Sequence, residues 1–152
     1  MSADSLARSR ATGAFERRVE RSLGRIAPRA APVVVACSGG PDSSAALVAV
    51  VRAGWRVHAA HFDHGLRPAG EAEGDRAWVE RLGALLGVPV LAGAAEGAGS
   101  DASEAVSREA RYRWLARALA ESGAVCCVTG HTRDDQAETV LLRLARGSGL
   151  AG

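Results

Sequence analysis

The sequence predicts an α/β fold, in which a doubly wound parallel sheet carries helices on both faces. Short apolar runs rich in β-branched residues alternate along the chain with longer segments whose apolar residues recur at helical spacing. Strands and helices that alternate in this way are typical of a parallel sheet covered on both sides. Small and polar residues follow three of the predicted strands, at the edge where such sheets bind ligands.

The first predicted element is an amphipathic helix within residues 1–30. Its apolar residues Phe15, Val19, Leu23 and Ile26 recur at helical spacing, and charged residues lie between them. We therefore expect one side of this helix to pack on the rest of the protein.

Four strands and four further helices are predicted after it. Each strand is a short apolar run, and each helix shows a helical apolar face or a start signal. The strands are predicted over 33–37, 55–62, 88–91 and 125–129, and the helices over 43–52, 71–87, 101–122 and 134–146. The three tryptophans, Trp55, Trp78 and Trp114, are expected to pack in the core rather than to stack on bases.

The composition excludes some kinds of chemistry. All 19 Lys and Arg residues are arginine, which we attribute to codon bias, and the formal net charge is +2. Without lysine, the chain has neither a Walker A phosphate loop nor a covalent lysyl intermediate.

The three cysteines, Cys37, Cys126 and Cys127, all lie in apolar runs and form no CxxC motif. This placement indicates buried free thiols in a reducing compartment rather than a zinc or redox site. No signal-peptide h-region or membrane-length apolar run is visible. We therefore expect a soluble, cytoplasmic protein.

A candidate phosphate-binding loop joins the first strand after residue 30 to the next helix. Two glycines allow the backbone to turn sharply and approach a ligand, and the helix start offers free N–H groups that suit an anion. An acidic residue in the loop is consistent with a Mg²⁺ ion between protein and phosphate. The alternative is an ordinary helix N-cap, in which Asp and Ser satisfy backbone donors. The loop residues are Ser38, Gly39, Gly40, Pro41, Asp42, Ser43 and Ser44.

Polar segments also follow the second and fourth strands. After the second strand, His61, Asp63 and His64 have a spacing that suggests zinc, but the sequence supplies no further nearby ligand. We instead expect the strand end to offer backbone groups to adenine. After the fourth strand, Gly130 and His131 begin the second polar segment.

The loop SGGPDSS resembles the PP-loop of the ATP pyrophosphatase superfamily. This resemblance implies a Rossmann-like fold of the adenine nucleotide alpha hydrolase kind, over residues 31–152. It also implies that ATP is split between its α and β phosphates and that the loop binds the departing pyrophosphate. The superfamily loop needs no Walker A lysine, in agreement with the composition.

Further motifs resemble those of the tRNA(Ile)-lysidine synthetase family. They are HxxHGLR at 61–67, ExxxRxxRY at 104–112, and GHxxDDxxET followed by RGSG at 130–149. By this resemblance Asp42, Arg111 and Asp135 are the expected catalytic residues, and Asp42 and Asp135 would hold Mg²⁺. Residues 38–44 with Gly130 and His131 would bind ATP.

The same resemblance implies a ligase that forms a carbon–nitrogen bond. ATP would adenylate the 2-carbonyl oxygen of the wobble cytidine in tRNA(Ile) with a CAU anticodon, and free L-lysine would then displace AMP. Two alternatives stay open: a tRNA thiolase of the same superfamily, and an inactive ATP-binding fragment. The sequence stops at Ala151 and Gly152, just after RGSG, so we expect the domain to be truncated at its C-terminal end.

Overall fold

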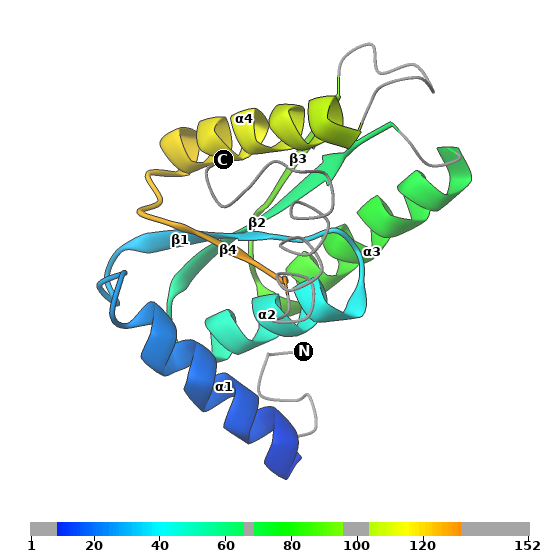
Figure 1. Cartoon of the computed structure of the whole chain (residues 1–152). Helices are drawn as coiled ribbons and strands as arrows, with labels where there is room; N and C mark the ends of the chain where they lie inside the picture. The colour runs from blue at the N-terminus through cyan, green and yellow to red at the C-terminus, as the bar shows by residue number, and fades with distance from the viewer. Residues whose placement is uncertain (1–8, 66–68, 96–103, 132–152) are drawn as a thin grey trace, which may run out of the picture.

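The computed structural model describes residues 9–65, 69–95 and 104–131 (Figure 1). The helices in this part of the chain are α1 (Arg10–Leu23), α2 (Pro41–Arg52), α3 (Ala69–Leu86) and α4 (Glu104–Ser122). The strands are β1 (Pro32–Ala36), β2 (Arg56–Asp63), β3 (Val90–Ala94) and β4 (Cys127–Thr129). The predicted last helix, 134–146, lies outside the described residues.

The four strands form one parallel sheet in the order β3-β2-β1-β4. Val34 of β1 aligns with His58 of β2 on one side and with Cys127 of β4 on the other. The chain therefore builds the sheet outward from β1 in one direction and then returns to add β4 on the other side of it. This reversal places a topological switch point between β1 and β4.

Helices cover both faces of the sheet, which confirms the predicted doubly wound fold (Figure 1). The larger cluster lies under α1, α2 and α3 and is centred on Val33, Val35 and Leu47, all fully buried. The smaller cluster lies under α4, where Leu115 packs on Val34. Continuous apolar runs such as β1 are buried on both sides, because helices cover both of their faces.

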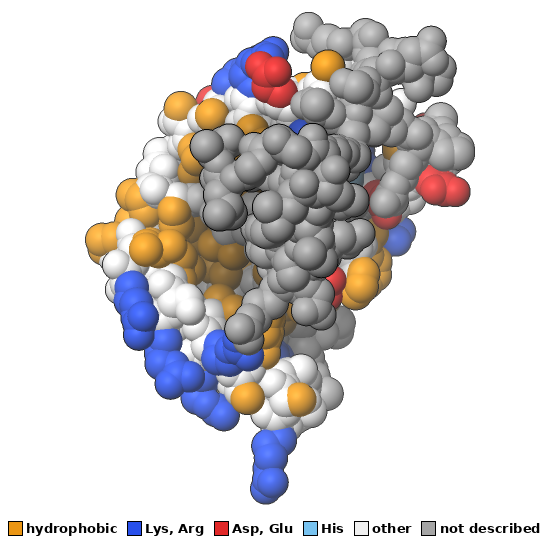
Figure 2. All heavy atoms as spheres, viewed as in Figure 1, with side chains coloured by type: hydrophobic (Ala, Val, Ile, Leu, Met, Phe, Trp, Pro, Cys, Tyr) orange, Lys and Arg blue, Asp and Glu red, His pale blue; other side chains and the backbone are white. Residues whose placement is uncertain are grey.

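The prediction for α1 is only partly right. Leu23 is buried in the larger cluster, but Phe15 is 42% exposed and Ile26 is 67% exposed. The helix instead buries Glu16, whose carboxylate forms a 2.6 Å ion pair with Arg52 of α2. The exposed side of α1 carries arginines, which line this helix in Figure 2: Arg10, Arg17, Arg18 and Arg21.

The predicted core position is right for two of the three tryptophans. Trp55 is buried in the larger cluster, and Trp114 is half-buried against the smaller one. The prediction for Trp78 is wrong, because its side chain is 44% exposed. Its indole N–H donates to the Ser44 hydroxyl, so a polar contact holds it at the surface.

Among the described helices, none has the length and apolar character needed to cross a membrane.

Candidate functional site

The loop of residues 38–44 lies at the C-terminal end of β1, beside the switch point of the sheet. Ser38 follows Cys37 at the strand end, and α2 begins at Pro41. Gly130 and His131 follow β4, the neighbour of β1. Two segments far apart in the sequence therefore meet where open α/β sheets bind their ligands.

The carbonyl group of Gly40 is the centre of the loop's hydrogen bonding. It accepts the hydroxyls of Ser43 at 3.0 Å and Ser44 at 2.9 Å, and the Ser44 N–H at 3.1 Å. The Ser43 hydroxyl also accepts the Ser38 N–H at 3.2 Å. The serines thus fix the shape of the loop around one carbonyl, besides offering oxygen atoms to a ligand.

The start of α2 lacks a side-chain cap. Its N-cap residue is Gly40, which makes no side-chain hydrogen bond, and Pro41 occupies the first turn. The N-cap alternative required Asp or Ser side chains to satisfy the first backbone donors. Because that cap is missing, the N–H groups of the first helical turn stay available to an anion.

Gly39 needs to be glycine for two reasons. Its φ is +93°, in the region that residues other than glycine rarely adopt. In addition, a Cβ atom on Gly39 would lie 2.7 Å from Oδ1 of Asp75. Asp75 lies on α3, and its contact with the loop could not be predicted from the sequence, because no local pattern shows which side of a helix faces a distant loop.

Gly130 packs directly on the start of α2. A Cβ atom at this position would lie 2.7 Å from Cα of Ser43 and 2.8 Å from its backbone nitrogen. Backbone meets backbone here, so neither side can move away cheaply. The structure therefore brings together Gly130 and the loop, as the sequence predicted from two separate segments.

A groove of about 930 Å³ runs from this meeting point along α1. Asp42 and His131 line it at the loop end, and Phe15, Val19 and Ile26 line its α1 side. Asp42 is exposed in the first turn of α2, where its carboxylate is accessible from the groove.

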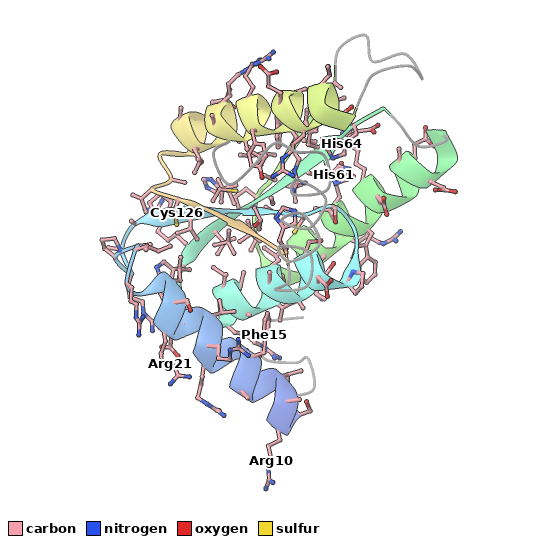
Figure 3. All side chains as sticks on the ribbon, in the orientation of Figure 1. Arg10, Phe15, Arg21, His61, His64 and Cys126 are labelled. Carbon is pink, nitrogen blue, oxygen red and sulfur yellow. The ribbon has the colours of Figure 1, made fainter. Side chains whose placement is uncertain are left out.

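The polar residues at the end of β2 are engaged with the fold, and Figure 3 labels His61 and His64 among them. His61 is 4% exposed, and its Nδ1 lies 2.9 Å from the Cys37 carbonyl oxygen, to which it donates. The carboxylate of Asp63 accepts the Gly65 N–H at 2.8 Å. His64 packs edge-on against the ring of Phe62. The His61 contact ties β2 to the segment that leads from β1 into the loop.

The two arginines of the ExxxRxxRY motif, Arg108 and Arg111, lie on α4 in different surroundings. Arg108 is exposed, with its guanidinium 5.4 Å from the ring centre of Tyr112. Arg111 is half-buried, and its positive charge acts to lower the pKa of the Cys127 thiol on β4. The predicted Asp135 lies outside the described residues, as does Glu138 of the GHxxDDxxET motif.

The cysteines are poor nucleophiles in this fold. Burial raises the pKa of the Cys37 thiol to about 12, with a smaller contribution from Cys127. Burial also raises the pKa of Cys126 and of Cys127, although Ala36 and Arg111 oppose the shift at Cys127. The reactive form of cysteine is the thiolate, so these environments disfavour thiol chemistry.

Comparison with known protein families shows what this arrangement resembles. A model of the PP-loop domain matches residues 12–152. Curated relatives include the tRNA(Ile)-lysidine synthases of Thermus thermophilus, 46% identical over 138 residues, and of Streptomyces coelicolor, 45% identical over 139 residues. These alignments cover 87% and 89% of this chain. The chain spans only 26% and 39% of the length of those two relatives.

A solved structure also has the same fold. A U34-tRNA thiolase from Methanococcus maripaludis, which carries a [4Fe-4S] cluster, superposes with a TM-score of 0.69. The superposition covers 89% of this chain and 50% of the thiolase, at 19% sequence identity.

Proposed function

The chain belongs to the PP-loop domain family, and we propose that it is the ATP-binding part of a tRNA(Ile)-lysidine synthase. The observation that carries the proposal is the loop of residues 38–44 at the switch point, with Gly130 packed on its helix. The similarity to lysidine synthases, at 43–48% identity, selects this enzyme within the family.

The proposed reaction has two steps. The 2-carbonyl oxygen of the wobble cytidine attacks the α-phosphorus of ATP, and pyrophosphate leaves. The amine of free L-lysine then attacks the activated carbon, the new carbon–nitrogen bond forms, and AMP leaves. The tRNA would be tRNA(Ile) with a CAU anticodon, met in the cytoplasm.

In this proposal the loop holds the phosphates that leave as pyrophosphate. The uncapped N–H groups at the start of α2 and the positive end of that helix suit their negative charge. Gly130 and His131 lie next to the same helix start and would border the nucleotide. Catalysis of this kind is chiefly electrostatic, and no residue needs to act as a covalent nucleophile.

The residues present fit a Mg²⁺ ion. Asp42 offers an exposed carboxylate at the helix start, and Mg²⁺ is commonly held by one or two protein carboxylates together with substrate phosphates. The ion would neutralise charge on those phosphates. We propose Asp42 as one ligand and Asp135 as the second, and Arg111 as a residue that contacts phosphate or the tRNA backbone.

The test is a product assay with purified protein, ATP, Mg²⁺ and tRNA(Ile) transcript. Labelled lysine should enter the tRNA, with one pyrophosphate released for each lysine incorporated. The assay should be run on this chain and on the chain extended by the remaining domains of a lysidine synthase. Failure of both to incorporate lysine, although both bind ATP, would overturn the proposed substrate.

A tRNA thiolase is the second candidate, because a thiolase shares the fold. The raised pKa values of Cys37, Cys126 and Cys127 argue against sulfur transfer by these side chains. Incorporation of labelled sulfur in place of lysine would establish the thiolase and exclude the ligase.

A further inference from the structure

Two side chains of α3 contact the phosphate loop from outside the candidate site. Asp75 and Trp78 are three residues apart on this helix and therefore lie on the same side of it. Asp75 lies against Gly39, and Trp78 contacts Ser44. We call this pair the α3 brace.

The Trp78 contact is a hydrogen bond of defined direction. Its Nε1–H donates to the hydroxyl oxygen of Ser44 at 3.0 Å, and that hydroxyl in turn donates to the carbonyl oxygen of Gly40 at 2.9 Å. A serine hydroxyl has one proton to give and two lone pairs to fill. The indole therefore supplies the partner that leaves the Ser44 proton pointing at Gly40, and successive bonds of this kind strengthen one another.

This chain of bonds matters because it ends at the carbonyl around which the loop is built. A carbonyl oxygen turned toward a phosphate would repel it. The Ser43 and Ser44 hydroxyls, which donate to the Gly40 carbonyl oxygen, keep that oxygen turned into the loop. Asp75 acts at the preceding residue, where its carboxyl group lies against Gly39 in the left-handed conformation. The brace thus contacts Gly39 through Asp75 and reaches the Gly40 carbonyl through Ser44.

We infer that Trp78 is a positioning residue for phosphate binding, which holds Ser44 and Gly40 in the geometry that accepts the ATP phosphates. The inference rests on the proposed function of the loop. It explains why a large aromatic side chain is kept 44% exposed on α3 rather than buried.

The test is Trp78→Phe, which keeps an aromatic ring and removes the N–H donor. Calorimetry should show binding of Mg-ATP and of pyrophosphate weakened by about fivefold, the worth of one net hydrogen bond, while adenosine binds unchanged. The matched control is Trp55→Phe, because the buried indole N–H of Trp55 has no hydrogen-bond partner in the described structure. This control should leave all three affinities unchanged, whatever it does to the melting temperature.

A double-mutant cycle separates positioning from a general structural effect. In a Ser44→Ala background the acceptor of the indole is gone, so Trp78→Phe should weaken ATP binding no further. Equal losses in both backgrounds, or an unchanged affinity in Trp78→Phe, would overturn the inference. Both outcomes presuppose that the unaltered protein binds ATP, so its failure to bind would instead refute the proposed function.

Discussion

The two faces of the sheet are covered in different ways. On the first face, α1, α2 and α3 pack large side chains onto β-branched residues, and the Glu16–Arg52 ion pair joins two of the helices. On the second face α4 covers a smaller cluster, in which the sheet presents small residues such as Ala36 and Ala60. The face of three helices also carries the start of α2 and the α3 brace.

This difference shows which face of the sheet supplies the contacts that fix the phosphate loop. The loop is fixed by contacts from α2 and α3, so its shape depends on the first face. On the second face, Trp114 of α4 approaches the backbone so closely that a Cβ atom on Gly93 would lie 2.0 Å from its Nε1. On this face α4 comes close to the sheet because the sheet residues are small, and not because large side chains interdigitate.

The largest expected effect comes from breaking the buried ion pair of the first face. Arg52→Leu removes the cation that lies 2.6 Å from the Glu16 carboxylate, and the two side chains are only 4% and 10% exposed. We expect a loss of about 3 kcal/mol in the free energy of unfolding, measured by urea denaturation. The control is Arg76→Leu, whose 2.9 Å pair with Glu80 is exposed and should be worth less than about 1 kcal/mol. Equal losses in the two variants would show that the buried pair does not anchor α1.

A matched pair of glycine substitutions compares the packing of the faces directly. Gly83→Ala on α3 places a Cβ atom 2.4 Å from Cγ2 of Val90, and Gly93→Ala on β3 places one against Trp114. Each should destabilise by about 1–3 kcal/mol, because neither site has room for a methyl group. The Gly93 variant should also change the tryptophan near-ultraviolet circular dichroism, since the Trp114 ring must move. A Gly93 variant with the spectrum and stability of the parent would refute the close approach of α4.

The thiols of the two faces should differ in their effect on stability at high pH. Cys37 is in the cluster of the first face, where burial raises its pKa to about 12, and Cys127 is in that of the second. The pKa of Cys37 is higher in the folded state than in the unfolded state, so the folded state binds the thiol proton more tightly. The stability that this proton contributes is complete below about pH 9 and is lost as the pH rises toward 12. The loss is about 1.4 kcal/mol for each pH unit.

Urea midpoints at pH 7.5 and pH 10 provide the measurement. Cys37→Ala should flatten the pH dependence more than Cys127→Ala does, because Arg111 and the Ala36 backbone oppose the shift at Cys127. The opposite order would mean that Cys37 is less buried than the structure has it.

The smallest effect is a gain. Gly74 lies within α3, and a Cβ atom there meets nothing within 4 Å. Gly74→Ala should raise the free energy of unfolding by about 0.5–1 kcal/mol, because alanine loses less backbone entropy in a helix. Gly87→Ala is the control: its space is equally open, but its φ is +68°, so thermal denaturation should show destabilisation. Two gains, or two losses, would contradict the assigned backbone conformations.

Much of the fold could be predicted because it depends on local patterns. A run such as Val33 to Val35 is buried on both sides wherever helices cover both faces, and β1 is found where the run predicts it. The loop of residues 38–44 was predictable for the same reason, since its glycines, serines and helix start are contiguous. Gly130 joins it because parallel strands end at the same edge of a sheet, and in the structure β4 pairs with β1.

The missed features all depend on contacts between distant elements. Helical spacing selected Phe15 and Ile26 for burial, but packing against α2 buries Glu16, which forms an ion pair with Arg52. Periodicity likewise placed Trp78 in the core, because it gives no information about a serine on another helix. Asp75 carried no motif at all. Each of these depends on which side of a helix faces its neighbour.

The close contact between Gly130 and Ser43 has a consequence for the order of assembly. Synthesis begins at the N-terminus, so β1, the loop and α2 exist long before β4 can pair with β1. Pairing of such distant segments is slow, because a long stretch of chain must be closed first. The proposed nucleotide site is therefore completed by the docking of β4, as one of the later events. Any ligand that binds only the completed site will draw the folding equilibrium toward that docked state by mass action.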